Sequence, residues 1–362
     1  MDNNTLLQTI TELSHEFGTE KFVKAGGGNT SCKNDEVLWV KPSGTTLIGL
    51  TPESFVKMDR AKLGLLYTAT PPAEAAAREE LVKNMMAAAV MPETAGRRAS
   101  VEAALHDSLS STFVVHTHPA WVNGLTCALG GEAAAAKLFP DALWLPYIDP
   151  GYTLCMAVRK AIVEYRTAHG GAEPKIIFLT NHGVFVSADT AEEIRAIYGE
   201  LESKLAAAYR ETGVNWTSVE VSAETPDKTA LGGIENLLRE ALGEDAAAIA
   251  VSGRFDAATG PITPDHMVYA KSFFYYGCLT IDNLLAVKAK LGYAPRVIVL
   301  PNAVIGVGKN EKAAKLALLL ALDGALVKQA ARAFGGIQYM DDRSRLFIEN
   351  WEVEAYRAKA AQ

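Results

Sequence analysis

The sequence predicts an α/β protein made of two parts, and three observations support this. The chain has 362 residues, more than one domain of ordinary size holds. Segments with helical periodicity alternate with short apolar runs that are typical of buried strands. A polar, weakly periodic stretch separates two such regions. We therefore expect a first domain over residues 1–213, a linker over 214–230 and a smaller α/β domain over 231–362.

The first domain is expected to open with an amphipathic helix. Two loops of small residues follow, AGGGNTS at 25–31 and KPSG at 41–44, with the strand-like segment EVLWV between them. Glycines in such loops let backbone N–H groups approach an anion, and serine or asparagine side chains add donors. Glycine–serine turns are common in proteins, so either loop alone indicates only a turn.

The next helix is expected in ASVEAALHDSLSS. Ser100 is a favourable N-cap, and Val101, Leu105 and Leu109 recur at helical spacing. Glu102 then lies in the first helical turn, where the helix dipole alone favours an acidic residue. Its place just before a strand with two histidines is what makes it the candidate acid/base.

The β-branched run FVVHTHP predicts a buried strand that ends at its proline. His116 and His118 are two residues apart, so their side chains share one face of a strand and suit two ligands of one metal ion. An isolated pair of this kind is as often structural. His182, in the turn-like segment TNHGVF, is the third candidate ligand. Three neutral imidazoles with one open position are typical of a catalytic zinc site.

The second domain is expected to alternate strands and helices. AAIAVSG and RVIVLPN are its apolar strand candidates, and residues 311–334 are its long helix candidate. This helix carries apolar residues around much of its circumference, which implies burial on several sides. No convergent set of titratable groups stands out over 231–362. We therefore expect a structural or docking role, without a metal ligand or an acid/base.

Composition excludes several classes of protein. The net charge of −7 argues against non-specific binding to nucleic acid, which needs a basic face. No apolar stretch approaches the length of a membrane span, and the N-terminus lacks the features of a signal peptide. The four cysteines form no CxxC pair and fit a reducing compartment. We expect a cytoplasmic protein without membrane or nucleic-acid partners.

Taken in order, GGGNTS, KPSG, ASVEAALH, VVHTHP and TNHGVF resemble the class II aldolase and adducin family. The resemblance covers about residues 10–210 and implies a three-layer α/β/α domain with a mainly antiparallel sheet. It implies that His116, His118 and His182 bind the metal, Zn²⁺ or another divalent ion. It also implies that Glu102 is the catalytic carboxylate.

The resemblance further implies a phosphate site lined by Asn29, Ser43, Gly44 and Ser100. Many aldolases of the family have two serines before the catalytic glutamate. In this chain the second position is Val101. One phosphate donor is therefore absent or replaced.

The later segments GPITPDHMVYAK, VIVLPNAVIGVGK and LFIENWEVEAYRAK resemble the region that follows the aldolase domain in rhamnulose-1-phosphate aldolase/short-chain dehydrogenase proteins. By this resemblance, the chain ends where the dehydrogenase would begin. The resemblance gives no role to this region. Family enzymes are homo-oligomers, commonly tetramers, and the same is expected here.

These observations lead to a carbon–carbon lyase as the first hypothesis. A metal-dependent aldolase would cleave a ketose 1-phosphate to dihydroxyacetone phosphate and a small aldehyde, with Glu102 moving protons. Tyr147 is a candidate proton donor to the aldehyde, although a packing role is equally consistent with its sequence. An epimerase or dehydratase that uses the same metal enediolate chemistry is the alternative. A non-catalytic, adducin-like interaction domain is the alternative from another class.

Overall fold

The computed structural model describes residues 1–352, without the side chains of residues 75 and 76. The chain forms two compact units. The first consists of Met1–Val122 and Glu132–Leu205, and the second of Asn123–Gly131 and Ala206–Gln362. The predicted domain limits at 213 and 231 stay predictions, and residues 353–362 of the predicted second domain lie outside the described residues. The end of the segment LFIENWEVEAYRAK lies outside them as well.

The first unit contains a seven-stranded sheet in the order β3-β2-β1-β4-β7-β6-β5. All neighbouring strands pair antiparallel except β5 and β6, which are parallel. The prediction of a mainly antiparallel sheet is therefore confirmed. The strands are β1 (Asn29–Lys33), β2 (Val37–Val40), β3 (Val56–Asp59), β4 (Phe113–Thr117), β5 (Leu143–Leu145), β6 (Ile176–Leu179) and β7 (Gly183–Ala188).

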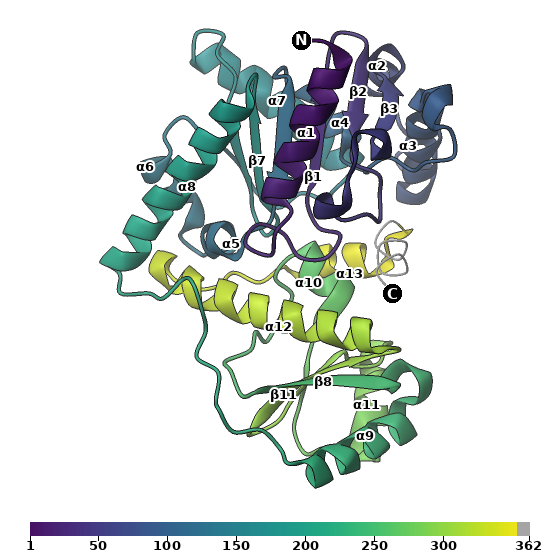
Figure 1. Cartoon of the computed structure of the whole chain (residues 1–362), viewed down its shortest axis with the longest axis vertical. Helices are drawn as coiled ribbons and strands as arrows, with labels where there is room; N and C mark the ends of the chain where they lie inside the picture. The colour runs from purple at the N-terminus through teal and green to yellow at the C-terminus, as the bar shows by residue number, and fades with distance from the viewer. Residues whose placement is uncertain (353–362) are drawn as a thin grey trace. The chain divides into compact units, whose positions relative to one another are not determined.

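Helices cover both faces of this sheet and give the three predicted layers (Figure 1). On one face, Ser14 of α1 (Asn3–Phe17) bonds Thr30 of β1, their oxygens being 2.6 Å apart. On the same face, the hydroxyls of Tyr198 in α8 (Ala191–Glu211) and Thr117 in β4 are 2.7 Å apart.

On the other face, α4 (Ala103–Ser108) and α7 (Tyr152–Ala168) pack against the sheet. Their side chains share one buried cluster with Val114 of β4 and Phe185 of β7. This apolar layer packs against the middle of the sheet, and burial of such side chains stabilises each by about 1.5–3 kcal/mol. The remaining elements are η1 (Leu47–Gly49), η2 (Pro52–Ser54), α2 (Arg60–Thr68), α3 (Ala75–Ala89), η3 (Pro92–Thr94), α5 (Ala120–Thr126) and α6 (Gly131–Leu138).

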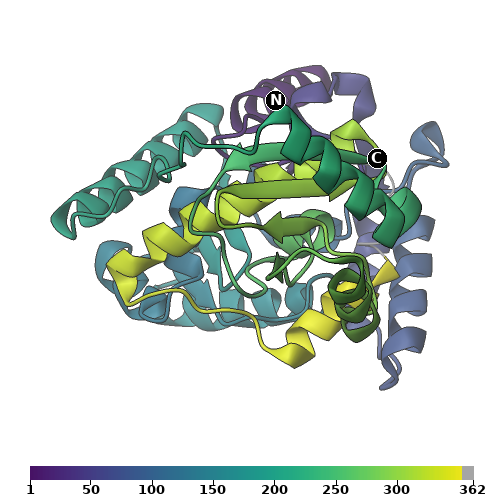
Figure 2. The same ribbon diagram turned by 90° about the horizontal axis from the view of Figure 1, so that it is seen from below.

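The second unit contains a four-stranded sheet in the order β8-β11-β10-β9. The long helix α12 lies along β8 and β11 on one face, as both views show (Figures 1 and 2). On the other face, α9 and α11 bury Leu238, Leu242 and Leu284 against Ile298 and Ile305. The elements are α9 (Lys228–Leu242), η4 (Gly243–Ala246), β8 (Ala248–Gly253), α10 (Pro264–Ala270), β9 (Tyr275–Tyr276), α11 (Ile281–Leu291), β10 (Val297–Val299), β11 (Ala303–Gly308), α12 (Glu311–Ala331), η5 (Arg332–Phe334) and α13 (Asp342–Asn350).

Three local predictions in the first unit are wrong. The loop expected at 25–31 ends in a strand, because β1 begins at Asn29. The helix expected to be capped by Ser100 begins later, with Glu102 at the N-cap position and without a side-chain capping bond. The strand with two histidines ends at Thr117, because the N–H of His118 donates to the carbonyl of Phe22 at 3.0 Å instead of to a neighbouring strand.

Candidate functional site

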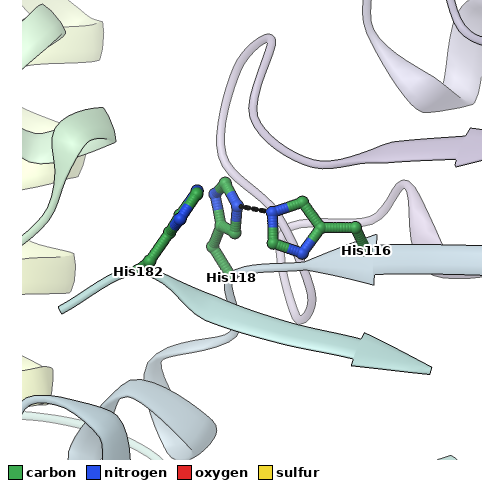
Figure 3. A group of neighbouring side chains, drawn as sticks. All are labelled: His116, His118 and His182. Carbon is green, nitrogen blue, oxygen red and sulfur yellow. Dashed lines mark hydrogen bonds between the residues drawn. The ribbon is translucent and has the colours of Figure 1, made fainter. Parts of the chain in front are cut away.

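Three histidines of the first unit lie together, and they come from two separate parts of the sheet (Figure 3). His116 is on β4, His118 follows the end of that strand, and His182 lies in the turn between β6 and β7. One ring nitrogen from each lies within 4.8 Å of the others. All three residues are at most 9% exposed. The predicted metal ligands are therefore neighbours in space, although the long segment 119–181 separates the third from the first two.

The turn that carries His182 depends on a glycine. A Cβ atom on Gly183 would lie 2.4 Å from the carbonyl oxygen of Thr117 and 2.6 Å from Cδ2 of His118. Asn181 takes a positive φ of 53°, which asparagine tolerates better than most residues. The close contact at Gly183 lets β7 begin directly against the end of β4. His182 and His118 are brought together in this way.

The hydrogen bonds of His116 determine which of its nitrogens faces the cluster. Its Nδ1 lies 3.0 Å from the carbonyl oxygen of Val184, so Nδ1–H donates and Nε2 carries the lone pair. This Nε2 atom is 2.9 Å from Nε2 of His118. The His116 ring also stacks on Phe185, with centroids 3.8 Å apart. An imidazole held by its second nitrogen on a backbone carbonyl is typical of a metal ligand.

Electrostatics favour the neutral form of His116. Burial holds its pKa well below the usual range, and the neighbouring His118 and His182 lower it further. A neutral imidazole is the form that binds a metal ion. The residues present therefore fit a divalent metal: three converging nitrogens, a fixed tautomer and an environment from which water is largely excluded.

Glu102 lies beside the histidine cluster. Its Oε2 is 3.5 Å from Nε2 of His116, and its Oε1 is 3.7 Å from Nε2 of His182. It is 6% exposed. The backbone N–H of Glu102 points at the hydroxyl of Ser100, at 3.3 Å, within the turn that precedes α4. The structure thus brings the predicted carboxylate to the predicted ligands.

Asn29 links this carboxylate to the sheet. Its Nδ2 donates to Oε2 of Glu102 at 2.7 Å, and its Oδ1 accepts from Nε2 of His106. His106 Nδ1 is in turn 2.7 Å from the hydroxyl of Ser31. Antiparallel pairing sets Asn29 opposite His116, so both side chains lie on the same face of the sheet.

Sequence reasoning missed this chain of contacts from His106 to Glu102. It depends on β1 beginning at Asn29, which the glycine-rich loop concealed. A signal was present in the sequence, because Asn29, Ser31 and Lys33 alternate as polar residues with the period of a strand.

The other predicted phosphate-site residues lie on two adjacent segments. The N–H of Ser43 donates to the carbonyl of Arg98 at 2.8 Å, and the N–H of Ser100 donates to the carbonyl of Lys41 at 3.1 Å. Residues 41–44, including Gly44, therefore run beside residues 98–100. The N–H of Lys41 also donates to the carbonyl of Thr30, the residue after Asn29. All four predicted residues lie on neighbouring segments of chain.

Tyr147 has a different setting. It lies in the loop between β5 and α7 and is partly buried. β5 forms the edge of the sheet and is separated from β7 by β6. Because β5 and β6 are parallel, and the N–H of Thr180 donates to the carbonyl of Leu145 at 3.0 Å, Tyr147 follows β5 at the same end of the sheet where His182 follows β6. Its role as a proton donor stays a prediction.

Comparison with known proteins identifies the first unit. Residues 8–209 match the family model described as the Class II Aldolase and Adducin N-terminal domain. The chain belongs to the class II aldolase and adducin family. The match runs from α1 to α8 and includes every residue of the candidate site.

A curated relative is similar along almost the whole chain. It is the uncharacterized oxidoreductase YuxG of Bacillus subtilis (strain 168), 24% identical over an alignment 421 residues long. The alignment covers 98% of this chain and 58% of that protein, so the chain spans less than two thirds of its relative.

Solved structures are similar to part of the chain. The N-terminal class II aldolase domain of a conserved protein from Thermoplasma acidophilum is 23% identical, with a TM-score of 0.47, over 56% of this chain and 92% of that chain. L-fuculose-1-phosphate aldolase from Thermus thermophilus is 18% identical, with a TM-score of 0.36, over 57% of this chain and 94% of that chain.

Among the residues that the structure describes, no helix combines the length and the apolar character needed to cross a membrane.

Proposed function

We propose that the chain is a metal-dependent aldolase that cleaves a ketose 1-phosphate to dihydroxyacetone phosphate and a small aldehyde. The observation that carries the proposal is the approach of Glu102 to His116 and His182, at 3.5 and 3.7 Å from their Nε2 atoms. A structural metal site needs no carboxylate at that position, whereas proton transfer beside a metal does. Membership of the class II aldolase and adducin family supports the same reaction class.

His116, His118 and His182 would hold the metal, which we take to be Zn²⁺ or another divalent ion. When bound, such an ion supplies Lewis-acid stabilisation of the negative charge that develops on substrate oxygens. The protein contributes the neutral nitrogens and the buried surroundings, which strengthen every electrostatic interaction in the site.

Glu102 is proposed to move the proton between substrate oxygen and carbon. The Asn29 amide fixes the carboxylate through Oε2, and His106 fixes the amide through Oδ1. Geometry matters here more than intrinsic acidity, because a general base must stand within hydrogen-bond reach of the proton it takes. Tyr147 is proposed as the donor to the departing aldehyde.

The substrate phosphate is proposed to lie against Asn29, Ser43, Gly44 and Ser100. These residues supply hydrogen-bond donors on adjacent segments and carry no charge. Their main contribution would therefore be orientation of the substrate, which can account for a large part of a rate enhancement.

Two alternatives use the same first unit. An epimerase or a dehydratase would need the same metal ligands and the same carboxylate, so the site geometry favours neither over the aldolase. A non-catalytic, adducin-like interaction domain would need neither the metal ligands nor the carboxylate. The combination of three converging histidines with Glu102 supports the enzymatic alternatives.

We further propose that the enzyme acts as a cytoplasmic homo-oligomer, with a tetramer as the state suggested by the family, and that the second unit serves assembly. Light scattering at catalytic concentrations tests this. A fully active monomer would contradict it.

A panel of ketose 1-phosphates tests the reaction itself. The zinc-loaded protein should release triose phosphate, measured with a coupled dehydrogenase, from at least one member of the panel. The Glu102→Gln variant with full metal content is the control for contaminating aldolase. Formation of an epimer without triose phosphate would indicate an epimerase instead of an aldolase. Loss of water without triose phosphate would indicate a dehydratase.

A further inference from the structure

Two partly buried cations of the second unit, Lys271 and Arg296, are not used by the proposed reaction. Lys271 follows α10, and Arg296 directly precedes β10. β9 and β10 are parallel, with Tyr275 opposite Ile298. Arg296 comes two residues before Ile298, and Lys271 comes four residues before Tyr275, so both cations lie at the edge where these two parallel strands begin.

An aromatic residue holds the lysine side chain at this edge. Nζ of Lys271 stands 5.4 Å from the centre of the Tyr293 ring, within the range of a cation–π contact. The Tyr293 hydroxyl accepts a hydrogen bond from the N–H of Phe273 at 3.3 Å. The ring is thus tied to the same segment as Lys271, and its hydroxyl lies at the same edge.

The carboxylate of Glu349, near this edge, is already engaged. Glu349 of α13 accepts from the hydroxyl of Ser272 and, at 2.6 Å, from Nη1 of Arg345. Within residues 1–352, the side chains of Lys271 and Arg296 have neither a hydrogen-bond acceptor nor a carboxylate at ion-pair distance. Burial lowers the pKa of Lys271, and the nearby charge of Arg296 lowers it further. The charges of Glu349 and Asp245 offset this lowering in part, but neither carboxylate forms an ion pair with Lys271.

The backbone of Lys271 is strained. It has a φ of 70° and a ψ of 162°, a conformation that is almost confined to glycine. Its N–H still donates to the carbonyl of Met267 at 3.2 Å, which ends α10. Such outliers persist only where the surroundings impose them, and they concentrate at binding sites. A glycine would take this conformation at a lower energetic cost than lysine does.

We propose that Lys271 and Arg296 bind a small oxyanion, namely the phosphate group of a phosphorylated metabolite. The planar guanidinium can pair with two phosphate oxygens, and the ammonium group adds a point charge beside them. The site is formed by the second unit alone and does not depend on the proposed aldolase reaction. Inorganic phosphate is the probe, because it presents the recognised group alone.

Acylation of lysines in the full-length protein, followed residue by residue by peptide mass spectrometry, tests the site. At constant ionic strength, inorganic phosphate should slow acylation of Lys271 severalfold and leave the exposed Lys290 of α11 unchanged. Acetate at the same ionic strength should protect less, which separates a phosphate from a carboxylate ligand. Absence of protection, equal protection of Lys290, or stronger protection by acetate would each overturn the proposal.

Substitutions at these positions distinguish a loss of phosphate binding from a loss of folding. Arg296→Met should abolish the phosphate protection of Lys271, whereas the matched variant Lys290→Met should retain it. Lys271→Gly relieves the strained backbone, so its melting temperature should equal or exceed that of the wild type. A clear fall in that temperature would give the strained lysine a structural role and overturn the proposal. Full protection of Lys271 in the folded Arg296→Met variant would do the same.

Discussion

At the scale of single residues, the candidate site consists of groups whose orientation is set by a second partner. His116 presents Nε2 because Nδ1 donates to Val184, and Glu102 is held by Asn29, which is held by His106. His106 is fully buried, and burial lowers its pKa well below the usual range, so it stays neutral. Fixed tautomers of this kind pre-organise a site and avoid rearrangement during reaction.

The first prediction concerns Glu102. Glu102→Gln keeps the size of the side chain and its contact with Asn29, but removes the base. Turnover should fall by roughly 10²–10⁴-fold while metal content is unchanged, because positioned acid–base catalysis contributes about that factor. Steady-state kinetics with metal analysis of the same sample measure both. Near-normal turnover in the metal-replete variant would place the base elsewhere.

Lys33 gives the first unit a pH-dependent stability. It is buried on β1, donates to the carbonyl of His106 at 2.9 Å, and burial lowers its pKa to about 7. Above that pH the folded protein has released a proton that the unfolded chain still binds, so the free energy of unfolding should rise with pH. The slope is at most about 1.4 kcal/mol per pH unit.

The contribution of Lys33 to the free energy of unfolding is measured by urea unfolding of the wild type and of Lys33→Met. The range is about pH 7 to 8.5, below the pH at which most thiols and phenols titrate. The wild type should gain stability relative to the variant as the pH rises. Parallel profiles for the two proteins would show that Lys33 keeps its proton in the folded state.

The sequence alone could predict the metal ligands but not the hydrogen bonds that orient them. His116, His118 and His182 stand in short motifs, and strand geometry explains why the first two converge. The bond from Asn29 to Glu102 joins residues 73 positions apart and depends on the register of β1 on β4. Register is a property of the assembled sheet, so no local pattern contains it.

At the scale of elements, the site lies where strands of the sheet end and turns begin. β4 supplies one ligand within its ladder and a second just beyond it, and the β6–β7 turn supplies the third. Helical and strand periodicity predicted β4, β8, β10 and α12, because each has a long or strongly apolar pattern. The strand β1 was not predicted, because its alternating residues are polar rather than apolar and are nevertheless buried.

The turn at Gly183 offers a test at this scale. Gly183→Ala should destabilise the protein by about 1–3 kcal/mol and weaken metal binding, because its Cβ would displace Thr117 and His118. The matched control is Gly64→Ala in α2, where a Cβ meets nothing within 4 Å. That change should be neutral or stabilise by about 0.5–1 kcal/mol. Thermal unfolding of the two variants compares them, and equal stability would show that the turn tolerates a side chain.

At the scale of the whole molecule, the two units are not two consecutive pieces of sequence. Residues 123–131 belong to the second unit, where the N–H groups of Leu129 and Gly130 donate to the carbonyls of Gly336 and Phe334 at 2.9 and 2.8 Å. The N–H of Gln338 donates to the carbonyl of Cys127 at 2.7 Å. Contacts between segments so distant in sequence could not be predicted from a linker composition.

These bonds predict the behaviour of a truncated chain. A fragment of residues 1–225 loses the partners of 127, 129 and 130, and should melt several degrees below the full-length protein, since each bond contributes about 0.5–1.5 kcal/mol. Calorimetry measures the difference. Metal bound by the folded fragment would support the proposal that the second unit supplies no ligand. An unchanged melting temperature would show that these contacts contribute nothing to the first unit.

The central claim is that three histidines form one metal centre, and metal analysis of purified variants tests it most directly. Wild type and His169→Ala, which alters an exposed histidine, should each contain about one divalent ion per chain after loading with zinc and dialysis. Alanine at His116, His118 or His182 should remove most of it while circular dichroism stays native. A folded triple-alanine variant that retains stoichiometric zinc would contradict the account.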